Sequence, residues 1–407
     1  MKTVCCTIVS ANYLAYAATL RDSLKLTDPE LPFRVLVVDR RDAAVEAVVT
    51  ELSLEVDFVE DLGIEGFEGM AFRYDIMELN TNVKPFFLKG LLARGFERVV
   101  YCDPDVYFYS PLLKALQVSE RSSIVLTPHV LGPAEEIDDE LPLLQTGVFN
   151  LGFVAVRNTP EGLKFLDWWG ARCSAAAYFD FPTGQFVDQK WIDLVPALFA
   201  DFFVLRERGL NVAYWNIHER ELHEGEGDIR VAGDPLVFFH FSGLARAGEG
   251  LTRHKKLKDS APLRLATQLG DRYRSRLVEN LHERVSKLPY GFGFFDDRQP
   301  ILPIYRLAYA ASIASDPGSN PFQASSAFGR QLRGSPIWSR HAPGVSASKA
   351  GKPADVGRAQ SWITRLLGMT LRVIGPGRYW FLCRYLAANL SFLRQGQVLR
   401  ALLGTSQ

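Results

Sequence analysis

The sequence has few cysteines, lacks a long apolar run and is nearly without acidic residues toward its C-terminus. The five cysteines are an odd number with no paired spacing, which argues against a disulfide framework and favours a reducing compartment. No stretch reaches the roughly 18 uninterrupted apolar residues that a membrane-spanning helix needs. The apolar run after Lys2 is interrupted at Ser10, after about seven residues, which is at the short limit for a signal-peptide core. We therefore expect a cytoplasmic protein.

Acidic residues are missing from one part of the chain rather than from the whole. The sequence has 46 basic and 46 acidic residues, but from Arg298 onward it has fourteen basic residues and only two acidic ones, Asp316 and Asp355. The part before Arg298 therefore holds 32 basic and 44 acidic residues. This asymmetry predicts an acidic body and a basic tail with its own electrostatic environment.

The first half of the chain alternates expected strands and helices. Buried strands are predicted at residues 4–9 and 33–38, with an apolar-periodic helix at 14–26 between them, which is the opening of a parallel sheet with right-handed crossovers. A further helix is expected at 86–94, and another at 188–199. With 47% hydrophobic and 23% charged residues over 407 positions, the chain is expected to form a large folded domain of the α/β class with additions.

Composition divides the chain into four expected parts. We predict a main α/β domain at residues 1–260 and a helical extension at 261–333. Residues 334–360 are rich in Gly, Pro, Ser and Ala, which is typical of a flexible linker. Residues 361–407 interleave arginines with apolar and aromatic residues and contain no acid, which predicts a basic amphipathic helical tail. This tail suits an interfacial helix on anionic lipid, or alternatively packs on the acidic body.

Two carboxylates end a β-favouring run near the middle of the main domain. Val99, Val100 and Tyr101 are followed by Cys102 and then by Asp103-Pro104-Asp105, so a strand delivers two carboxylates to its own end. Such a pair can bind a hard divalent cation, and the carboxyl edge of an open α/β sheet is where ligands bind. An Asp-x-Asp pair by itself is a weak signal, because chance pairs occur in many surface turns.

Five other residues, at four places in the chain, have polar side chains next to apolar segments. Lys84 precedes a proline-started helix, where it could add charge to a phosphate site or simply be solvated. Asn150 lies in an apolar run and needs a partner, either a sugar hydroxyl or the backbone. Asp188 and Gln189 precede an apolar helix, where local pattern favours helix capping over sugar binding. His240 follows residues 236–239 and, in isolation, is more often a core histidine than a metal ligand.

These motifs in their order resemble bacterial sugar-nucleotide-dependent glycosyltransferases of the GT-A fold, in the broad group related to glycosyltransferase family 8 and glycogenin-like enzymes. The resemblance covers roughly residues 1–256. It departs from the group at Pro104, where alanine is frequent, and after Gly243, which the usual Lys-Pro-Trp does not follow; Arg253, His254 and Lys255 could substitute there. The motifs that carry the resemblance are Asn12-Tyr13, Lys84-Pro85-Phe86, 101–105, 149–152, Asp188-Gln189, 211–216 and 239–243.

The resemblance implies a fold and a role for each matching position. The fold would be a Rossmann-like GT-A domain with a C-terminal helical extension. Asp103, Asp105 and His240 would hold Mn²⁺ or Mg²⁺ against the diphosphate of a nucleotide sugar. For the donor and its transferred sugar, the implied contacts are Asn12 and Tyr13 at the nucleoside, Lys84 and Gly243 at the phosphates, and Asn150, Asp188 and Gln189 around the sugar.

The function that we predict is metal-dependent transfer of a hexose from a nucleotide-diphosphate donor to a saccharide or lipid-linked acceptor. The setting would be cell-surface polysaccharide synthesis, in the cytoplasm or peripherally at the inner face of the membrane. The resemblance implies retention of anomeric configuration, and we expect no nucleic-acid partner. Two alternatives stay open, a metal-dependent nucleotide-sugar hydrolase and a catalytically silent binding protein on the same fold.

Overall fold

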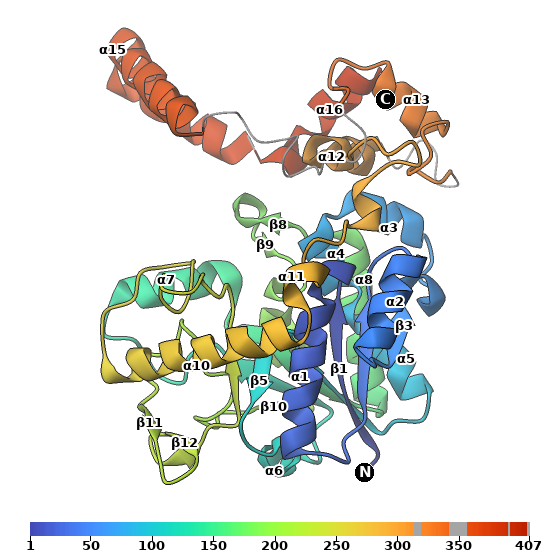
Figure 1. The fold of residues 1–407 in the computed structure, drawn as a ribbon. Helices are drawn as coiled ribbons and strands as arrows, with labels where there is room; N and C mark the ends of the chain where they lie inside the picture. Colours follow the sequence, from blue (N-terminus) through green and yellow to red (C-terminus); the bar gives the residue numbers. More distant parts are fainter. Residues whose placement is uncertain (313–318, 342–355, 390, 405–407) are drawn as a thin grey trace. The chain divides into compact units, whose positions relative to one another are not determined.

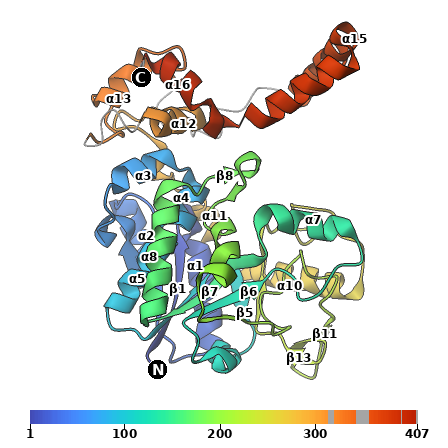
Figure 2. The same cartoon turned by 180° about the vertical axis from the view of Figure 1, so that it is seen from behind.

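The computed structural model describes residues 1–312, 319–341, 356–389 and 391–404, and the chain forms two compact units (Figures 1 and 2). Unit 1 continues beyond residue 260, the expected end of the main domain, because helix α10 (Ala261–Glu279) buries Leu265, Leu269 and Tyr273 in its core. Unit 1 comprises Met1–Ile64, Asn80–Phe179 and Gln185–Tyr290, and unit 2 comprises Glu65–Leu79, Asp180–Gly184 and Gly291–Gln407.

Unit 1 is built on a seven-stranded sheet with the order β10-β6-β7-β4-β1-β2-β3. Its strands are β1 (Thr3–Val9), β2 (Phe33–Val37), β3 (Val56–Phe58), β4 (Arg98–Cys102), β6 (Ile124–Pro128), β7 (Phe149–Arg157) and β10 (Phe202–Val204). All pairings are parallel except those of β7, which runs antiparallel to β4 and β6. The α/β class is confirmed, whereas the direction of β7 was not anticipated from the sequence.

Helices cover both faces of this sheet, as the full burial of β1, β4 and β6 requires. Apolar residues of α1 and α2 pack on one face, and α5 and α8 pack together against β4 and β7 on the other (Figures 1 and 2). The helices of unit 1 other than α10 are α1 (Leu14–Thr27), α2 (Ala43–Glu51), α5 (Lys84–Ala93), α6 (Leu112–Ala115), α7 (Ile137–Thr146), α8 (Pro160–Ala175), α9 (Val195–Leu198) and α11 (His282–Val285).

One predicted helix of unit 1 is wrong. Residues 188–199 form the 3₁₀ helix η5 (Lys190–Leu194) and the short α9 instead of one apolar helix. Pro196 lies in the first turn of α9, where its fixed φ and missing N–H are tolerated, but it cannot continue a helix that begins well before it.

Two further small sheets lie within unit 1, and a third pairs β8 (Phe179–Asp180) with β9 (Gln185–Phe186), where the chain passes briefly into unit 2. Strands β11 (Leu222–Glu224), β12 (Ile229–Val231) and β13 (Asp234–Pro235) form an antiparallel sheet. Strand β14 (Phe238–His240) pairs antiparallel with β5 (Val106–Phe108), and the register sets His240 opposite Val106. This pairing brings the end of one apolar run to the residue next to Asp105, across more than 130 positions of sequence.

The described part of unit 2 is mainly helical, with an antiparallel bridge between Phe294 and Pro300, which confirms the expected C-terminal helices. Its core gathers aromatic rings around Phe72, and the buried Arg306 guanidinium donates to the carbonyl oxygens of Ala71, Phe72 and Tyr74. No helix among the described residues combines the length and hydropathy needed to cross a membrane. The helices are α3 (Phe67–Arg73), α12 (Pro303–Ser312), α13 (Ala327–Arg333), α15 (Val356–Asn389) and α16 (Gly396–Leu403), while α4 (Ile76–Asn82) continues into unit 1.

Most of the predicted linker, at 342–355, and the segments 313–318 and 405–407 lie outside the described residues. The predicted tail at 361–407 is helical where it is described, and its first helix already begins at Val356.

Candidate metal and donor site

The two aspartates lie at the carboxyl end of β4, as the sequence predicts. Asp103 directly follows β4, Asp105 directly precedes β5, and the Val106 amide donates to the Asp103 carbonyl across the turn, at 3.1 Å. The Tyr101 hydroxyl donates to Oδ1 of Asp103 at 2.6 Å. Since this bond occupies Oδ1, the other oxygen, Oδ2, is available to a ligand.

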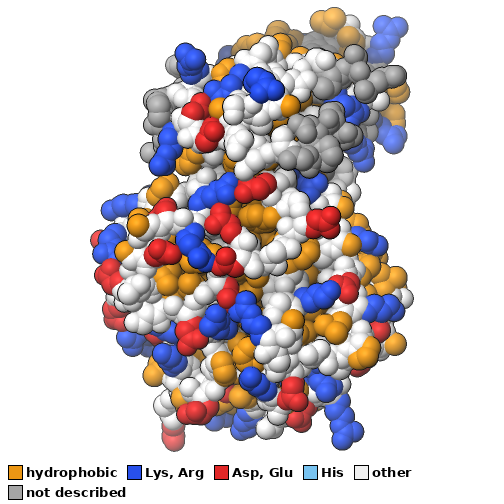
Figure 3. Space-filling model, turned by 90° about the vertical axis from the view of Figure 1, so that its right-hand side faces the viewer, with side chains coloured by type: hydrophobic (Ala, Val, Ile, Leu, Met, Phe, Trp, Pro, Cys, Tyr) orange, Lys and Arg blue, Asp and Glu red, His pale blue; other side chains and the backbone are white. Residues whose placement is uncertain are grey.

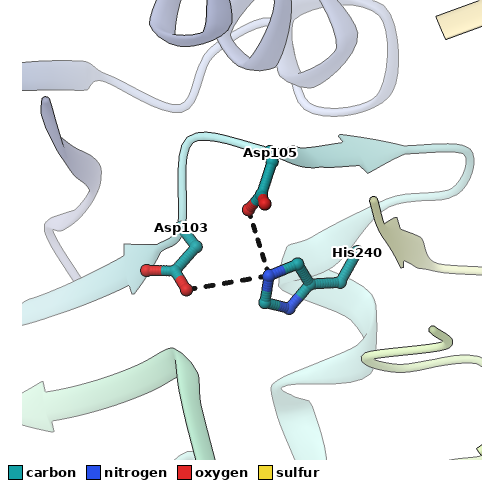
Figure 4. Close-up of side chains that lie close together, drawn as sticks. All are labelled: Asp103, Asp105 and His240. Atoms are coloured by element: carbon teal, nitrogen blue, oxygen red, sulfur yellow. Dashed lines mark ion pairs between the residues drawn. The ribbon is translucent and has the colours of Figure 1, made fainter. Parts of the chain in front are cut away.

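His240 faces these two carboxylates (Figure 4). Its Nε2 is 3.0 Å from Oδ1 of Asp105 and 3.7 Å from Oδ2 of Asp103. Burial by itself lowers the pKa of His240, but the carboxylates of Asp105 and Asp103 outweigh it and raise the pKa above its ordinary value. His240 is buried and at the same time lies within reach of both carboxylates.

A cation fits this group of donors. One oxygen of Asp103, one of Asp105 and a nitrogen of His240 all lie within 4.8 Å of one another. Two carboxylates and one imidazole form a mixed hard and borderline donor set, which suits Mn²⁺ and also accommodates Mg²⁺. Three protein ligands leave coordination positions for oxygens of a bound substrate.

Asn211 orients the imidazole from its other side. Oδ1 of Asn211 lies 3.1 Å from Nδ1 of His240, while its Nδ2 donates to Oγ1 of Thr127 at 3.2 Å and Oδ1 of Asn150 at 3.0 Å. The amide orientation makes Nδ1 the donor, so in the neutral imidazole the lone pair of Nε2 would be left for a cation held between the aspartates. Asn211 has φ 52°, a left-handed conformation that asparagine tolerates better than most residues.

Gly152 leaves the space that this imidazole occupies. A Cβ atom at position 152 would clash with Cε1 of His240 and lie 2.7 Å from Oδ1 of Asn150. The glycine in the apolar run 149–153 is thus explained by close approach of a side chain rather than by a backbone conformation.

Replacing Asn211 by glycine is expected to weaken Mn²⁺ binding by about 10–100-fold, because the imidazole loses the partner that fixes its tautomer and ring orientation. Glycine keeps the left-handed backbone available. Calorimetric titration with Mn²⁺ measures the affinity, and imidazole ¹⁵N shifts measure the tautomer. Unchanged affinity together with an unchanged tautomer would show that Asn211 does not orient His240.

Lys84 and Asp188 form a buried ion pair. Nζ of Lys84 lies 2.9 Å from Oδ2 of Asp188, donates to the Leu151 carbonyl at 3.0 Å and is 4.3 Å from the ring centroid of Tyr101. Burial raises the pKa of Asp188, although Lys84 opposes this shift. Lys84 lies at the expected helix start, but in this structure its charge is engaged by Asp188.

The capping interpretation of Asp188 is wrong. The N-cap residue of the following helix η5 is Gln189, with no side-chain capping bond. Val187, immediately before Asp188, has φ 42°, which is strained for a β-branched residue and is a feature that concentrates at functional sites.

Hydrogen bonds fix the side chains of Asn150 and Gln189 next to the backbone of Leu151 and Gly152. Oε1 of Gln189 accepts from the Leu151 amide and its Nε2 donates to the Thr146 carbonyl, both at 2.9 Å. Oδ1 of Asn150 accepts from the Gly152 amide at 3.1 Å as well as from Asn211. The polar partners of Asn150 in the described structure are therefore backbone groups and neighbouring side chains. Both side-chain amides, of Asn150 and Gln189, bond to backbone amides at the start of β7, the strand next to the candidate metal site.

His129 belongs to this network, although the sequence analysis did not identify it. Its Nε2 is 3.2 Å from Nδ2 of Asn150 and its Nδ1 is 3.3 Å from the Val148 carbonyl. Burial lowers the pKa of His129 to about 4. The position of His129, directly after the strand β6, is the only sequence signal that could have indicated it.

This low pKa predicts acid sensitivity of unit 1. Between about pH 6.5 and pH 4 the unfolded chain binds a proton at His129 and the folded chain does not, so acidification destabilises the fold by up to about 3 kcal/mol. Chemical unfolding of wild type and His129→Gln in EDTA measures this, since their stability difference should shift by this amount in favour of the variant from pH 7 to pH 4. A pH-independent difference would contradict the prediction.

The expected nucleoside contacts lie beside the metal site. The Tyr13 ring is 38% exposed and stacks on Tyr16, with centroids 4.6 Å apart. Burial and then the Asp105 carboxylate raise the pKa of Tyr13. Oδ1 of Asn12 accepts from the Ser10 hydroxyl at 2.6 Å, so Tyr13 offers an exposed ring face, while Asn12 is partly engaged.

Gly243 forms a tight turn against the segment expected to replace the missing phosphate-binding motif. It has φ 60°, and a Cβ there would clash with the His254 ring. The Arg253 amide donates to the Gly243 carbonyl at 2.9 Å. Lys255 instead pairs with Asp139, at 2.6 Å, so Arg253 and His254 are the basic residues of this segment nearest to the turn.

Asp39 was not predicted as a site residue, although the second strand was expected to end there. Its buried carboxylate accepts from the Ala11 amide at 3.2 Å, at the same sheet edge as Asn12. An acidic residue directly after a buried parallel strand was the signal available in the sequence.

Comparison with known proteins gives two sequence relatives, the uncharacterized Bacillus subtilis proteins YfnF and YfnD, and several structural neighbours. No protein-family model matches the chain. An uncharacterized Bacillus subtilis protein, YfnF, is 28% identical over 249 residues, which covers 60% of this chain and 82% of YfnF. The galactosyltransferase LgtC, in complex with donor and acceptor sugar analogues, has a TM-score of 0.43 at 12% identity, covering 68% of this chain and 96% of LgtC.

The glycosyltransferase GlyE of Streptococcus pneumoniae has a TM-score of 0.39 at 13% identity, covering 72% of this chain and 67% of GlyE. Likenesses of this size establish neither a family nor an activity.

Proposed function

We propose that this protein is a metal-dependent glycosyltransferase of the GT-A fold. It would move a hexose from a nucleotide-diphosphate donor to a saccharide or lipid-linked acceptor in cell-surface polysaccharide synthesis. The observation that carries the proposal is the convergence of Asp103, Asp105 and His240 at the carboxyl edge of the sheet. The sequence resemblance to the group related to glycosyltransferase family 8 supports the same activity.

Asp103, Asp105 and His240 would bind Mn²⁺ or Mg²⁺, whose charge stabilises the nucleoside diphosphate as the bond to the sugar breaks. Asn211 and Tyr101 keep two of these ligands oriented, through Nδ1 of His240 and Oδ1 of Asp103. A leaving group stabilised in this way needs no general acid, so these residues position charge and transfer no proton.

The remaining residues would hold the donor in place. The exposed face of Tyr13 provides a platform for the base, with Asn12 at the ribose and the turn at Gly243 near the phosphates. Asp188, Gln189 and Asn150 would surround the sugar, and we propose retention of its configuration. Lys84 would act by neutralising Asp188 and fixing the Leu151 carbonyl, a role that its ion pair and its hydrogen bond support.

Thermal unfolding with a panel of nucleoside diphosphates tests the donor site. A matching nucleotide at about a hundred times its Kd should stabilise the protein by about 3 kcal/mol in the presence of Mn²⁺, which appears as a rise of several degrees in Tm. The same nucleotides in EDTA are the control, and they should give little stabilisation. If no nucleotide stabilises the protein with Mn²⁺, the alternative of a catalytically silent protein gains support.

Transfer and hydrolysis are separated by following donor consumption with and without saccharide acceptors. A transferase consumes donor mainly when an acceptor is present and forms a new glycosidic bond. If free sugar is released at the same rate in the presence and in the absence of each acceptor tested, the hydrolase alternative is favoured.

We propose a cytoplasmic setting. The cysteines at positions 5, 6, 102, 173 and 383 are not joined in disulfides, and the first four are buried, which is compatible with a reducing compartment. We also expect no role for nucleic acid.

A further inference from the structure

Helix α15 is rich in apolar residues and yet has little packing. It spans Val356–Asn389 and consists of two segments that meet at Gly375, which has φ 77° and precedes Pro376. From Trp362 to Leu386, no residue whose burial is described is buried. The chain contains no acidic residue after Asp355, so Arg365, Arg372, Arg378 and Arg384 have no acidic residue three or four positions away.

The first segment is amphipathic. Trp362, Leu366, Met369 and Val373 follow one another at spacings of four and three, which places them on one side of the helix. All four are exposed, Trp362 to 65% and Val373 to 83%. Arg365 and Arg372, seven residues apart, form a second row beside this stripe.

The second segment presents aromatic side chains next to arginines. Trp380, Phe381 and Tyr385 are exposed, Phe381 to 68%. The Arg384 guanidinium lies over the Trp380 ring at 4.8 Å from its centroid. A tryptophan or tyrosine combines an apolar body with a polar tip, and an arginine can lay its stem along apolar surface and keep its charge in water.

An exposed apolar stripe of this length indicates a binding surface, and the arginines beside it indicate which kind of surface it binds. An exposed apolar face lined by arginines alone complements a surface that is apolar inside and negatively charged outside. Acidic and basic side chains alternate among the described residues drawn in Figure 3, so that face of the molecule offers no continuous acidic area. No helix among the described residues could span a bilayer, so a lipid contact would be made at the surface.

We propose that α15 lies in the interface of an anionic phospholipid bilayer. Trp362, Val373 and Phe381 would enter the boundary between headgroups and acyl chains, and Arg365, Arg372 and Arg384 would contact lipid phosphates. Gly375 lets each segment turn its apolar side to the same surface. The inference does not depend on the sugar-transfer proposal, although membrane contact would bring the site to lipid-linked acceptors.

Co-sedimentation of the full chain with vesicles tests the proposal. The protein should bind vesicles of equal parts phosphatidylcholine and phosphatidylglycerol, bind pure phosphatidylcholine far more weakly, and lose binding as salt is raised. Arg365→Gln/Arg372→Gln/Arg384→Gln should weaken binding about a hundredfold. Trp362→Ser/Phe381→Ser should weaken it at least tenfold through loss of apolar burial.

Matched control variants carry similar changes on exposed positions elsewhere. Arg330→Gln and Arg246→Gln control for lost charge, and Val118→Ser, at a position 58% exposed, controls for lost apolar surface; all should bind like wild type. Because the altered residues of α15 are exposed, thermal unfolding should be unchanged. Transfer to a soluble acceptor should also be unchanged, which separates this proposal from that of the enzymatic activity.

Several outcomes would overturn the proposal. One is sedimentation of wild type that does not depend on vesicles, or binding that neither α15 variant reduces. Another is concentration-dependent self-association in analytical ultracentrifugation that Trp362→Ser/Phe381→Ser abolishes without any vesicle binding, which would assign the stripe to a second copy of the chain. Absence of both vesicle binding and self-association would instead favour packing of the tail on the acidic body.

Discussion

Replacing Asp103 by asparagine is expected to lower kcat/KM for sugar transfer by about a thousandfold or more, because several kcal/mol of transition-state charge stabilisation depend on the cation. Asparagine keeps an oxygen that can accept from Tyr101 but removes the negative charge. Mn²⁺-dependent stabilisation by nucleoside diphosphates should disappear together with turnover. Transfer rates and Mn²⁺ titrations on the same preparation measure both effects.

The fold should survive this change, because the side chain of Asp103 is 31% exposed. Asp259→Asn is a suitable control, since its exposed carboxylate pairs only with Arg264 among the contacts in the described structure. Removal of the metal by EDTA should reproduce the loss in wild type and add nothing in the Asp103 variant. Turnover of Asp103→Asn equal to wild type would refute the metal site.

Replacing Lys84 by methionine is expected to destabilise unit 1 by about 3–5 kcal/mol, because it leaves the Asp188 carboxylate buried without its counter-charge. Burial already raises the pKa of Asp188 with Lys84 present, and losing the ammonium would raise it further. The folded variant then binds a proton more readily than the unfolded chain, so it regains stability as the pH falls. Denaturant unfolding at several pH values measures both effects.

A matched control lies on the same helix. Lys89 forms an exposed ion pair with Asp167, and Lys89→Met should cost less than about 1 kcal/mol. The double variant Lys84→Met/Asp188→Leu removes both charges and should recover much of the lost stability, but not activity. If Lys84→Met is as stable as wild type at neutral pH, the ion pair does not stabilise unit 1. That result would instead favour a direct contact between Lys84 and a substrate phosphate.

Much of unit 1 could be predicted from local pattern. The strands β1, β2 and β4 and the helices α1 and α5 were expected within a few residues of their bounds, since each is a short apolar run or an apolar-periodic segment with clear ends. The prediction of one helix at 188–199 was wrong because the apolar residues there are spaced by the burial of a loop and of η5. A separate short helix, α9, then begins near Pro196. The antiparallel direction of β7 could not be read from the sequence, because the same apolar run fits either direction when both faces are buried.

In the candidate site, too, some features could be predicted from neighbouring residues and others could not. Asp103 and Asp105 could be placed at a strand end because the strand and the acids are adjacent in sequence. His240 could be nominated only through the resemblance, since a histidine after an apolar run is compatible with a plain core position. The role of Asn211 and the pairing of Lys84 with Asp188 were beyond sequence reasoning, because each depends on contacts between segments that are far apart in the chain.

The sequence by itself determined the α/β alternation, the carboxylate pair at the end of a buried strand and the acid-free tail, because these follow from neighbouring residues and their periodicity. Only the tertiary structure decided that an imidazole faces the carboxylates and that the ammonium of Lys84 is bound to Asp188. Pairing of β14 with β5 fixes the first and burial beside β7 fixes the second. The position of the imidazole depends on strand register, and the ion pair depends on desolvation. Neither strand register nor desolvation can be read from a single position of the chain.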